Sequence, residues 1–523
     1  MSKISRIVSL IIVLPLIALF ILTTDPFKAS TATTYYVATT GSDTTGNGTS
    51  SNPWRTLAYA VTKVPSGQGH IIHLKSGTFV ETSPISVPVG VNIEGEGADY
   101  TIIKSNISNA LIKLESSSKT SGSQWLKNFK IDGDNKKLDY GISIKGREWV
   151  EVHGIVFSNC EISGLTIMST SASAAAQPSF YIKGIKVYNC TFNYCGKDYS
   201  NWTSGNLMIS GTDGGDIYNI NITDNQGYGI KFNPSGYGWI KGTKIHDCTI
   251  SVNEYDALWG SDAAIEIWNP IEGCEIYNVN SSTWFSIVDN ANLNSNPTNT
   301  IKVHDNRIVY TRNNNDTEGI EFQVGGGECY NNYIENTYTG IALWGIDCKY
   351  QLNNIIRHNV IYNPKAVQDE WHAGIWLWST QSKSTLTNGT KIYHNVIDGT
   401  ARGVWLKCEW YSLLKDTKIR NNIFINLQDS AITTSDNVQA IQNTTATNNC
   451  YYNVPMFLHN YHGQTYNFYQ SNNYNNDPGL KKTGNRPDPF YRPSSSGSFI
   501  INKGIDVGYQ YNGSAPDIGR FEY

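Results

Sequence analysis

Two short sequence patterns alternate along most of the chain and constrain its fold more than any other feature. They recur from about Gly141 to Asp436 with periods of roughly 22 to 35 residues. One is of the type IxxNxI, as in IKVYNCTF, TKIHDCTI and TKIYHNVI, and the other is of the type GIxLx, as in GIKFN, GIEFQ and GIWLW. Apolar and polar residues alternate in both, which is typical of half-buried strands, and an Asn or Asp marks the turn.

Each repeat therefore supplies short strands that cannot bury an apolar face alone, so that stacking of repeats has to build the core. A sandwich or a propeller would instead need hairpins, and two-residue Asn-Gly turns between adjacent strands are scarce in this chain. The 523 residues, of which only 16% are charged, lack segments rich in Ala, Leu, Glu and Lys. The sequence predicts an all-β solenoid, a parallel β-helix.

The N-terminus has the order of a secretory signal. Lys3 and Arg6 precede an apolar run from Ile7 to Leu22, and small residues follow it. An uncleaved membrane anchor is the alternative. We expect a signal peptide over 1–32 and a secreted chain, extracellular or periplasmic, or held at the cell surface, with no stable membrane insertion after cleavage. We divide the rest into an N-terminal cap with the first coils (33–130), the β-helix with the active face (131–450), and C-terminal coils with a cap (451–523).

Charge and cysteine content narrow the partners. A net charge of −4 and a pI near 6.2 give no basic field that could bind a nucleic acid or an anionic membrane. Separately, we expect the protein to be a monomer. The nine Cys are interpreted mostly as a buried stack of free thiols, because Cys160, Cys190 and Cys248 each follow an Asn or Asp. Cys190 and Cys195 are the candidates for a local disulfide, and without a CxxC pair a metal site is disfavoured.

The two ends of the mature chain resemble a known family. The opening YYVATTGSDTTGNGTSSNPWRTLAYAV with GHIIHLKSGTFVE, and the close GSFIINKGIDVGYQYNGSAPDIGRFEY, are similar to those of pectate-lyase-like secreted β-helix proteins. The resemblance implies a right-handed parallel β-helix that acts on carbohydrate polymers. Within the opening, Pro53 to Val64 is predicted to form a capping helix, with Ser51 or Asn52 as N-cap. Its apolar face holds Leu57, Ala60, Val61 and Val64.

Aligning the GIxLx pattern turns the chain into columns, because stacked coils place equivalent residues above one another. A first outward column is predicted to hold Ser143, Thr166, Lys231, Glu266, Glu321, Ala342, Trp376, Trp405 and Thr433. A second is predicted to hold Lys145, Met168, Asn233, Trp268, Gln323, Trp344, Trp378, Lys407 and Ser435. One coil between Glu266 and Glu321, WFSIVDNAN, has no fixed register, which leaves Asp289 pointing outward beside the two Glu or inward.

The carboxylates of these columns are the candidate catalytic residues. Glu266 and Glu321 lie two coils apart, so their backbones are expected about 10 Å apart, with Asp289 between them in one register. Inverting glycosidases hold their carboxyls at about 6.5 to 9.5 Å and retaining ones at about 5 to 5.5 Å. Glu266 with Glu321 fits the inverting case better, and either Glu with Asp289 fits the retaining case. Crowding is expected to raise the proton affinity of at least one of them.

The remaining candidates are predicted to bind substrate. Five indoles on neighbouring coils are expected to stack on flat sugar faces along a groove, unless the loops 251–263 and 364–373 cover them as a secondary core: Trp268, Trp344, Trp376, Trp378 and Trp405. Lys231, Asn233 and Gln323 share the face, and His372 is expected to reach over it from the rim.

The sequence thus favours a glycoside hydrolase that cleaves a neutral or weakly charged polysaccharide and needs no cofactor. The second hypothesis is a polysaccharide lyase or uronate epimerase that uses Lys231, Arg402 or Lys407, or a calcium ion held by Glu266 and Asp289. The third is a glycan-binding surface protein without catalysis. The Asn-Thr-Asp, Asp-Asp and Gly-His-Gly signatures expected of polygalacturonases are absent.

Overall fold

The computed structural model describes residues 32–523, with gaps at 136–137, 171–179, 197–203, 226, 233–239, 253–262, 269, 291–296, 312–317, 365–371, 381–385 and 462–466. Residues 1–31 of the predicted signal peptide and Asn233 lie outside the described residues. Among those that are described, no helix is long and apolar enough to cross a membrane.

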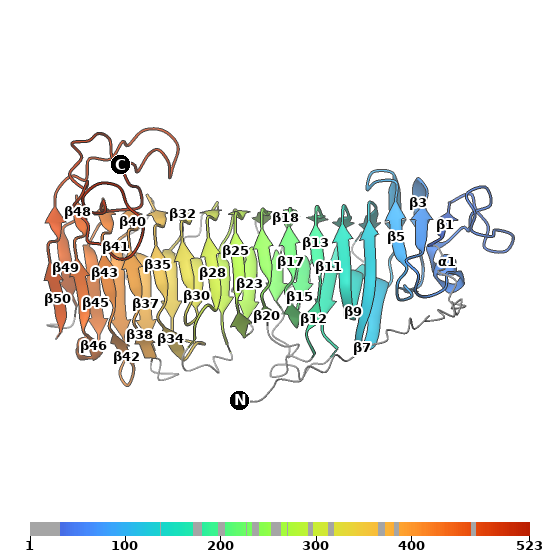
Figure 1. The fold of residues 1–523 in the computed structure, drawn as a ribbon, viewed down its shortest axis with the longest axis horizontal. Coiled ribbons are helices and arrows are strands. Elements are labelled where there is room, and N and C mark those ends of the chain that lie inside the picture. Colours follow the sequence, from blue (N-terminus) through green and yellow to red (C-terminus); the bar gives the residue numbers. More distant parts are fainter. Residues whose placement is uncertain are drawn as a thin grey trace, which may run out of the picture.

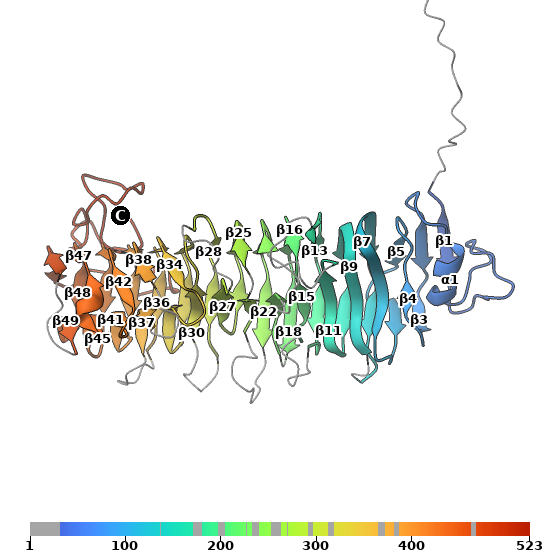
Figure 2. The ribbon, with the colours of Figure 1, turned by 90° about the horizontal axis from the view of Figure 1, so that it is seen from below.

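The chain forms one elongated stack of β-coils, as Figures 1 and 2 show. Each complete coil contributes a strand to each of three walls, and strands of successive coils pair in parallel. The predicted all-β parallel β-helix is confirmed. The first wall carries the GIxLx pattern, the second carries the first half of IxxNxI, and the third carries its second half.

The first wall comprises β11 (Cys160–Met168), β15 (Leu207–Ile209), β19 (Ile230–Phe232), β23 (Ile265–Trp268), β27 (Phe285–Val288), β30 (Glu318–Gln323), β33 (Thr339–Trp344), β37 (Ala373–Ser379), β41 (Arg402–Cys408), β45 (Ser430–Asp436) and β49 (Met456–Asn460). The second comprises β13 (Lys186–Tyr188), β17 (Asp216–Tyr218), β21 (Lys244–His246), β25 (Cys274–Tyr277), β28 (Ile301–His304), β31 (Glu328–Tyr330), β35 (Ile355–Arg357), β39 (Lys391–Tyr393), β43 (Lys418–Arg420), β47 (Thr444–Thr447) and β50 (Phe468–Ser471).

The third wall comprises β3 (Gly77–Val80), β6 (Thr101–Lys104), β8 (Lys130–Asp132), β10 (Val156–Ser158), β14 (Thr191–Asn193), β18 (Asn221–Asn225), β22 (Thr249–Val252), β26 (Asn280–Ser281), β29 (Arg307–Val309), β32 (Tyr333–Glu335), β36 (Val360–Tyr362), β40 (Val396–Asp398), β44 (Ile423–Ile425), β48 (Cys450–Tyr452) and β51 (Tyr474–Asn475). The first and second walls join through the long strands β7 (Ala110–Lys127) and β9 (Leu138–His153), which follow β1 (Thr34–Val37), β2 (Ile71–Leu74), β4 (Ile85–Ser86) and β5 (Asn92–Gly95).

Short corner strands form two further small sheets between the first and second walls. They are β12 (Ile182–Lys183), β16 (Thr212–Asp213), β20 (Ile240–Lys241) and β24 (Ile271–Glu272), and then β34 (Tyr350–Leu352), β38 (Leu386–Asn388), β42 (Leu413–Lys415) and β46 (Ile441–Gln442).

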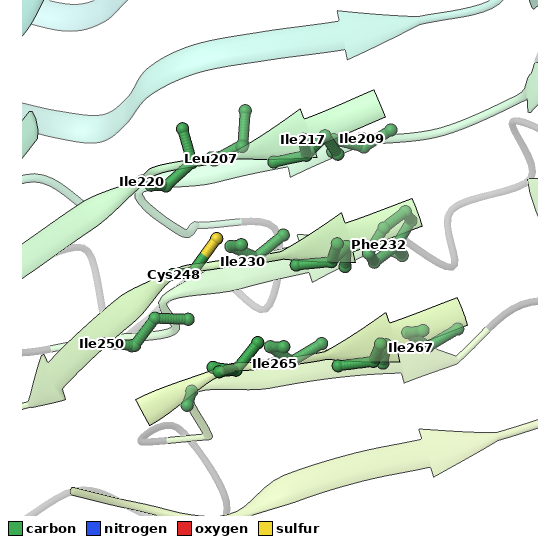
Figure 3. Packing of buried hydrophobic residues seen from close by; sticks show 14 of the residues in the cluster. Leu207, Ile209, Ile217, Ile220, Ile230, Phe232, Cys248, Ile250, Ile265 and Ile267 are labelled. Atoms are coloured by element: carbon green, nitrogen blue, oxygen red, sulfur yellow. The ribbon is translucent and has the colours of Figure 1, made fainter. Parts of the chain in front are cut away.

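The core is a set of apolar columns inside the coils. Leu207, Ile230 and Ile265 occupy equivalent positions on three successive strands of the first wall. Figure 3 shows their side chains above one another in neighbouring coils. All three are fully buried, as the period-2 pattern requires. Their opposite neighbours on each strand point out of the coil, which is what creates the outward columns.

Asparagines make the turn between the second and third walls. The residue at the corner has a left-handed backbone, for example Asn421 with φ 57°, which Asn tolerates better than most side chains. The next residue is a buried Asn whose side chain bonds its counterpart one coil on. Asn395 Nδ2 donates to Asn422 Oδ1 at 3.0 Å and to the Ile356 carbonyl at 3.0 Å. The Asn in the IxxNxI pattern therefore satisfies backbone groups that the turn leaves unpaired.

The cysteines occupy related positions earlier in the solenoid. All nine are buried and none forms a disulfide, so the predicted bridge between Cys190 and Cys195 is wrong. Cys190 and Cys248 follow a left-handed residue at the corner between the second and third walls, where later coils place the Asn ladder. Cys160 follows Asn159 at a different corner, between the third and first walls. Cys274 and Cys329 lie instead within strands β25 and β31 of the second wall. The prediction of buried thiols without disulfides is therefore confirmed, but the single stack is wrong, because Cys160 lies at another corner and Ile220 occupies the rung between Cys190 and Cys248.

The N-terminal helix is shorter than predicted. Helix α1 spans Leu57–Lys63, and its N-cap is Thr56, whose hydroxyl accepts a hydrogen bond from the amide of Tyr59. Ser51 and Asn52 are not the cap, because Pro53 to Arg55 are held in non-helical bonds, with Trp54 donating to the Tyr36 carbonyl. The helix still buries Leu57, Ala60 and Val61 against the first coils.

The C-terminal segment folds back along the side of the solenoid (Figure 1). Before this segment, a 3₁₀-helix at Val438–Ala440 follows strand β45 in one of the last coils. Side chains after residue 479 pack on the outer face of the third wall, where they form one apolar cluster: Leu480, Tyr491, Ile500 and Ile518 against Tyr333, Val360, Val396, Ile423, Ile425 and Cys450.

Candidate active site

The first outward column runs along the first wall in the predicted order. Consecutive rungs pair Lys231 with Glu266, Glu321 with Ala342, Trp376 with Trp405, and Trp405 with Thr433. One coil is missing from the prediction. Met208 of β15 lies between Thr166 and Lys231, and its strand begins with Leu-Met-Ile instead of the Gly-Ile that guided the alignment.

Ser286 resolves the coil of uncertain register. On β27, Ser286 pairs with Glu266 on one side and with Glu321 on the other, and Val288 pairs with both Trp268 and Gln323. Asp289 follows the strand end and is buried, so of the two registers left open the one that places it between the two Glu is wrong. Phe285 and Ile287 supply the inward alternation, which leaves the Ser286 hydroxyl in the outward column.

Glu266 is held in a buried ion pair. Its Oε2 lies 2.7 Å from Lys231 Nζ, and Lys231 Nζ lies 3.4 Å from the centre of the Tyr228 ring. Glu266 is 7% exposed and Lys231 is 1% exposed. Lys231, a candidate for substrate binding, is thus buried and contacts the carboxylate of the neighbouring coil. Tyr228 escaped the prediction because it precedes the strand and belongs to neither column.

Glu321 accepts two hydrogen bonds from its own face. Ser286 Oγ donates to its Oε2 at 2.5 Å, and Gln323 Nε2 donates to its Oε1 at 2.6 Å. The donors are themselves oriented: Trp268 Nε1 donates to Ser286 Oγ at 2.9 Å, and the Asp347 amide donates to Gln323 Oε1 at 2.8 Å. An indole N–H and a backbone N–H can only donate, so the whole chain of bonds converges on Glu321 as the acceptor.

Burial dominates the proton affinity of both carboxyls. It raises the pKa of Glu266 to about 7; Lys231 opposes this shift, and the charge of Glu321 adds to it. Burial likewise raises the pKa of Glu321, against the hydrogen bonds from Ser286 and Gln323, and the Asp347 carboxylate raises it further. Burial lowers the pKa of Lys231, and Glu266 counteracts that. The site therefore holds a carboxyl that carries a proton near neutral pH.

The register fixes the spacing of the two glutamate backbones. Glu266 and Glu321 are two rungs apart with Ser286 between them, so their backbones are about 10 Å apart. A backbone spacing of this size is compatible with the carboxyl separation of about 6.5 to 9.5 Å found in inverting glycosidases. The retaining alternative rested on Asp289 and loses its basis with the corrected register.

The tryptophans form a packed cluster beside this site, not an open strip. Trp376 stacks on Trp405 with ring centres 4.6 Å apart and on Trp378 at 5.2 Å. Trp376 is 0% exposed and Trp405 is buried, so the prediction that both offer open faces to sugars is wrong. Residues 253–262 and 365–371 of the two predicted covering loops lie outside the described part of the chain.

Three indoles keep partial access to solvent. Trp268, Trp344 and Trp378 are half-buried, and Trp344 meets Trp378 edge to face with ring centres 6.1 Å apart. Trp378 Nε1 donates to Glu409 Oε1 at 3.0 Å, and Lys407 Nζ lies 4.3 Å from the Trp378 ring centre. Of the predicted platforms, these are the ones whose exposure is compatible with contact to a ligand.

His372 is not a rim residue. Its side chain is 1% exposed and its ring lies 4.4 Å from that of Tyr338. It immediately precedes β37, and its carbonyl accepts a hydrogen bond from the Arg402 amide on the next coil. Arg402, considered for the lyase hypothesis, is also buried, and it lies 3.5 Å from Asp429 Oδ2.

No metal cluster is found in the described residues: none of their His, Cys, Asp and Glu side chains gather in groups of three that could hold an ion.

Asp347 is the functional candidate that the columns missed. It lies after β33, outside both columns, yet its amide orients Gln323 and its charge acts on Glu321. The sequence WGID carried no pattern that could have identified it.

The comparisons with known proteins concern the fold. Residues 315–474 match the family model described as the right handed beta helix region. This part of the chain is a right-handed β-helix. The resemblance to pectate-lyase-like β-helix proteins is thereby confirmed for the architecture. No curated protein sequence matches the chain.

Several solved structures are similar in shape. The catalytic unit of a GH87 α-1,3-glucanase from Streptomyces thermodiastaticus is 13% identical, with a TM-score of 0.43. The match covers 84% of this chain and 68% of the glucanase chain. A tailspike protein mutant of E. coli bacteriophage HK620 in complex with a pentasaccharide is 12% identical, with a TM-score of 0.48, covering 81% and 79%. XylC in complex with xylose is 11% identical, with a TM-score of 0.38, covering 86% and 87%.

Proposed function

We propose that the chain is an exported glycoside hydrolase that cleaves a polysaccharide by inversion, with Glu266 as general acid and Glu321 as general base. The observation that carries the proposal is the buried carboxyl pair two rungs apart, one member of which has a pKa of about 7. Hydrolysis of a glycosidic bond needs both a proton donor and a proton acceptor at neutral pH.

The hydrogen bonds support this division of roles. Both oxygens of Glu321 receive donors whose orientation is fixed by Trp268 and Asp347, and these bonds oppose the rise that burial gives to the pKa of Glu321. Glu266 has one cationic partner, Lys231, and a pKa at which the acid and its carboxylate coexist near neutrality.

In the reaction, Glu266 gives its proton to the oxygen of the leaving sugar. Glu321 takes a proton from a water molecule, which attacks the anomeric carbon from the opposite face. The glycosidic C–O bond breaks as the new C–O bond forms. When products leave, Glu321 releases its proton to solvent and Glu266 regains one from solvent. Lys231 offsets the charge of Glu266 after proton transfer.

The surroundings favour a substrate without many charges. Two Glu and Asp347 face one buried Lys, so the site has no excess of cations to neutralise a polyuronate. The half-buried rings of Trp344 and Trp378 offer apolar faces further along the wall, suited to sugar rings of a chain that extends along the coil axis.

The decisive experiment measures reducing ends released from a panel of plant and algal polysaccharides. Glu266→Gln and Glu321→Gln should each lower kcat by about 10² or more, since each removes a proton donor or acceptor. Glu272→Gln, whose side chain is exposed at the end of strand β24, is the matched control and should retain parental activity. Activity within a few fold of the parent in either active-site variant would refute the assignment.

A polysaccharide lyase is the second candidate, and Lys231 is the observation that favours it. A buried amine of lowered pKa beside a carboxylate is suited to removing a proton next to a uronate carboxyl. Its product would carry an unsaturated uronate, detectable by ultraviolet absorbance, where a hydrolase gives reducing ends without it. Loss of that activity in a chelator would point to the predicted calcium dependence.

A further inference from the structure

A separate cavity lies on another wall of the solenoid, under the returning C-terminal segment. It has a volume of about 350 Å³ and is lined by the ends of β36, β40 and β44, by the turns that follow them, and by residues between Leu480 and Phe490. Tyr362, Asp398 and Ile425 are consecutive rungs of the third wall. The candidate active site uses none of these residues.

One guanidinium is fixed in the wall of this cavity. The Arg486 carbon Cζ lies 4.0 Å from the centre of the Tyr362 ring and 3.9 Å from that of Phe490. Arg486 Nε donates to Tyr491 Oη at 3.3 Å, which is the one acceptor that this guanidinium meets among the described residues. Its two terminal nitrogens thus remain available to an acceptor in the cavity, in a plane set by the two rings.

A buried carboxylate lies beside it. Asp398 is 5% exposed; its Oδ1 accepts from Asn426 Nδ2 at 2.8 Å and its Oδ2 accepts from the Tyr491 hydroxyl at 2.7 Å. Tyr491 therefore connects Asp398 to Arg486 and fixes both groups. Each carboxylate oxygen has a further lone pair, which suits the hydroxyl group of a ligand.

The remaining lining completes a set of contacts for a sugar ring. Ile425, Leu480 and Pro364 offer apolar surface for the C–H faces, and Lys482 stands at the rim, where it is 3.7 Å from Asp477 Oδ2. A planar carboxylate matches the edge of the Arg486 fork, whereas Asp398 disfavours a ligand with a second negative charge such as phosphate. The volume is at the lower end of that of ligand pockets, the size of a small occupant.

We propose that this cavity binds one carboxylate-bearing sugar residue, a uronate, with its carboxylate on Arg486 and its hydroxyls on Asp398. The site is independent of the proposed hydrolase chemistry. It would attach the protein to a glycan that contains occasional acidic units while the first wall acts on the neutral stretches. The C-terminal segment thus supplies half of a binding site as well as covering the third wall.

The test is a ligand-observed NMR titration of the full-length mature protein with glucuronate and galacturonate, and with glucose and galactose as neutral counterparts. We expect the uronates to bind at least tenfold more tightly than the neutral sugars. Arg486→Lys should weaken uronate binding at least tenfold, because an ammonium cannot replace the planar fork. Lys481→Gln, adjacent in sequence and not in the lining, is the control and should bind like the parent.

Further outcomes decide against the proposal. Equal affinity for uronates and neutral sugars, full uronate binding by a folded Arg486→Lys, or displacement by equimolar inorganic phosphate would overturn it. If Arg486→Lys does not fold, the parent protein is treated with an arginine-selective dicarbonyl with and without glucuronate, and modification of Arg486 is measured by mass spectrometry. Protection of Arg486 by glucuronate would support the site, and equal modification would overturn it. The double variant Glu266→Gln, Glu321→Gln should leave uronate binding intact even if the hydrolase proposal fails. Loss of uronate binding in this double variant would place the uronate at the first wall.

Discussion

The hydroxyl of Ser286 joins the two parts of the candidate site. It accepts a hydrogen bond from Trp268 and donates one to Glu321, on the rung that separates Glu321 from Glu266. A carboxylate on that rung would have placed a third negative charge within one coil of each Glu, whereas a hydroxyl supplies a donor at no cost in charge. The coil whose register the sequence left open therefore places a neutral hydrogen-bond donor, and not a third carboxylate, between Glu266 and Glu321.

The charge of Lys231 should set the upper limit of the working pH range. Glu266 acts in its protonated form, which is lost as the pH rises through about 7. Lys231 lowers the pKa of Glu266, so Lys231→Met should raise that pKa and move the descending limb of the kcat/KM profile upward by about one pH unit or more. Lys241→Met, whose partner Glu272 is exposed, is the control. A limb that stays in place, or moves down, would contradict the role of Glu266 as the acid.

Stacked elements explain why the tryptophans were misassigned. Strands β33, β37 and β41 bring Trp344, Trp378, Trp376 and Trp405 onto neighbouring rungs, as the columns predicted. Rings on rungs about 4.8 Å apart can also stack on each other, and Trp376 stacks on Trp405 in this way, which leaves both of these rings buried. An outward position on a strand is therefore not the same as an exposed one.

Trp376→Ala should accordingly act on stability. Removing a fully buried indole should lower the free energy of unfolding by about 3 to 5 kcal/mol, measured by the shift of the denaturant midpoint. Trp410→Ala, whose ring is exposed, is the control and should change it by less than about 0.5 kcal/mol. If Trp376→Ala kept the parental midpoint and lost only glycan affinity, the open-strip hypothesis would be restored.

On the scale of the whole molecule, the C-terminal segment connects coils that are far apart in sequence. Ile518 is fully buried against the third wall, the Gly519 carbonyl contacts His394, and Arg520 donates to the carbonyls of Asn331 and Asn332. Coils of a solenoid otherwise contact only their neighbours, so such a segment makes several coils unfold together. It also forms the cavity at Arg486.

Ile518→Ala should therefore destabilise the last coils as a unit. We expect a loss of about 2 to 5 kcal/mol, measured by chemical unfolding with tryptophan fluorescence. Ile505→Ala in the same segment is the matched control, because Ile505 is 40% exposed whereas Ile518 is fully buried. Equal midpoints for the two variants would show that the segment is a loosely attached tail.

The sequence by itself determined the coil. The alternation of apolar residues and the Asn at each turn are local signals, and repetition of a local signal fixes which residues share a rung, as for Lys231 with Glu266. The tertiary structure decided what each outward side chain meets. Phe285, Ile287 and Val288 made the parity of one coil ambiguous, and the burial of Trp376 and the cavity at Arg486 arise from packing between segments distant in sequence, which no local period encodes.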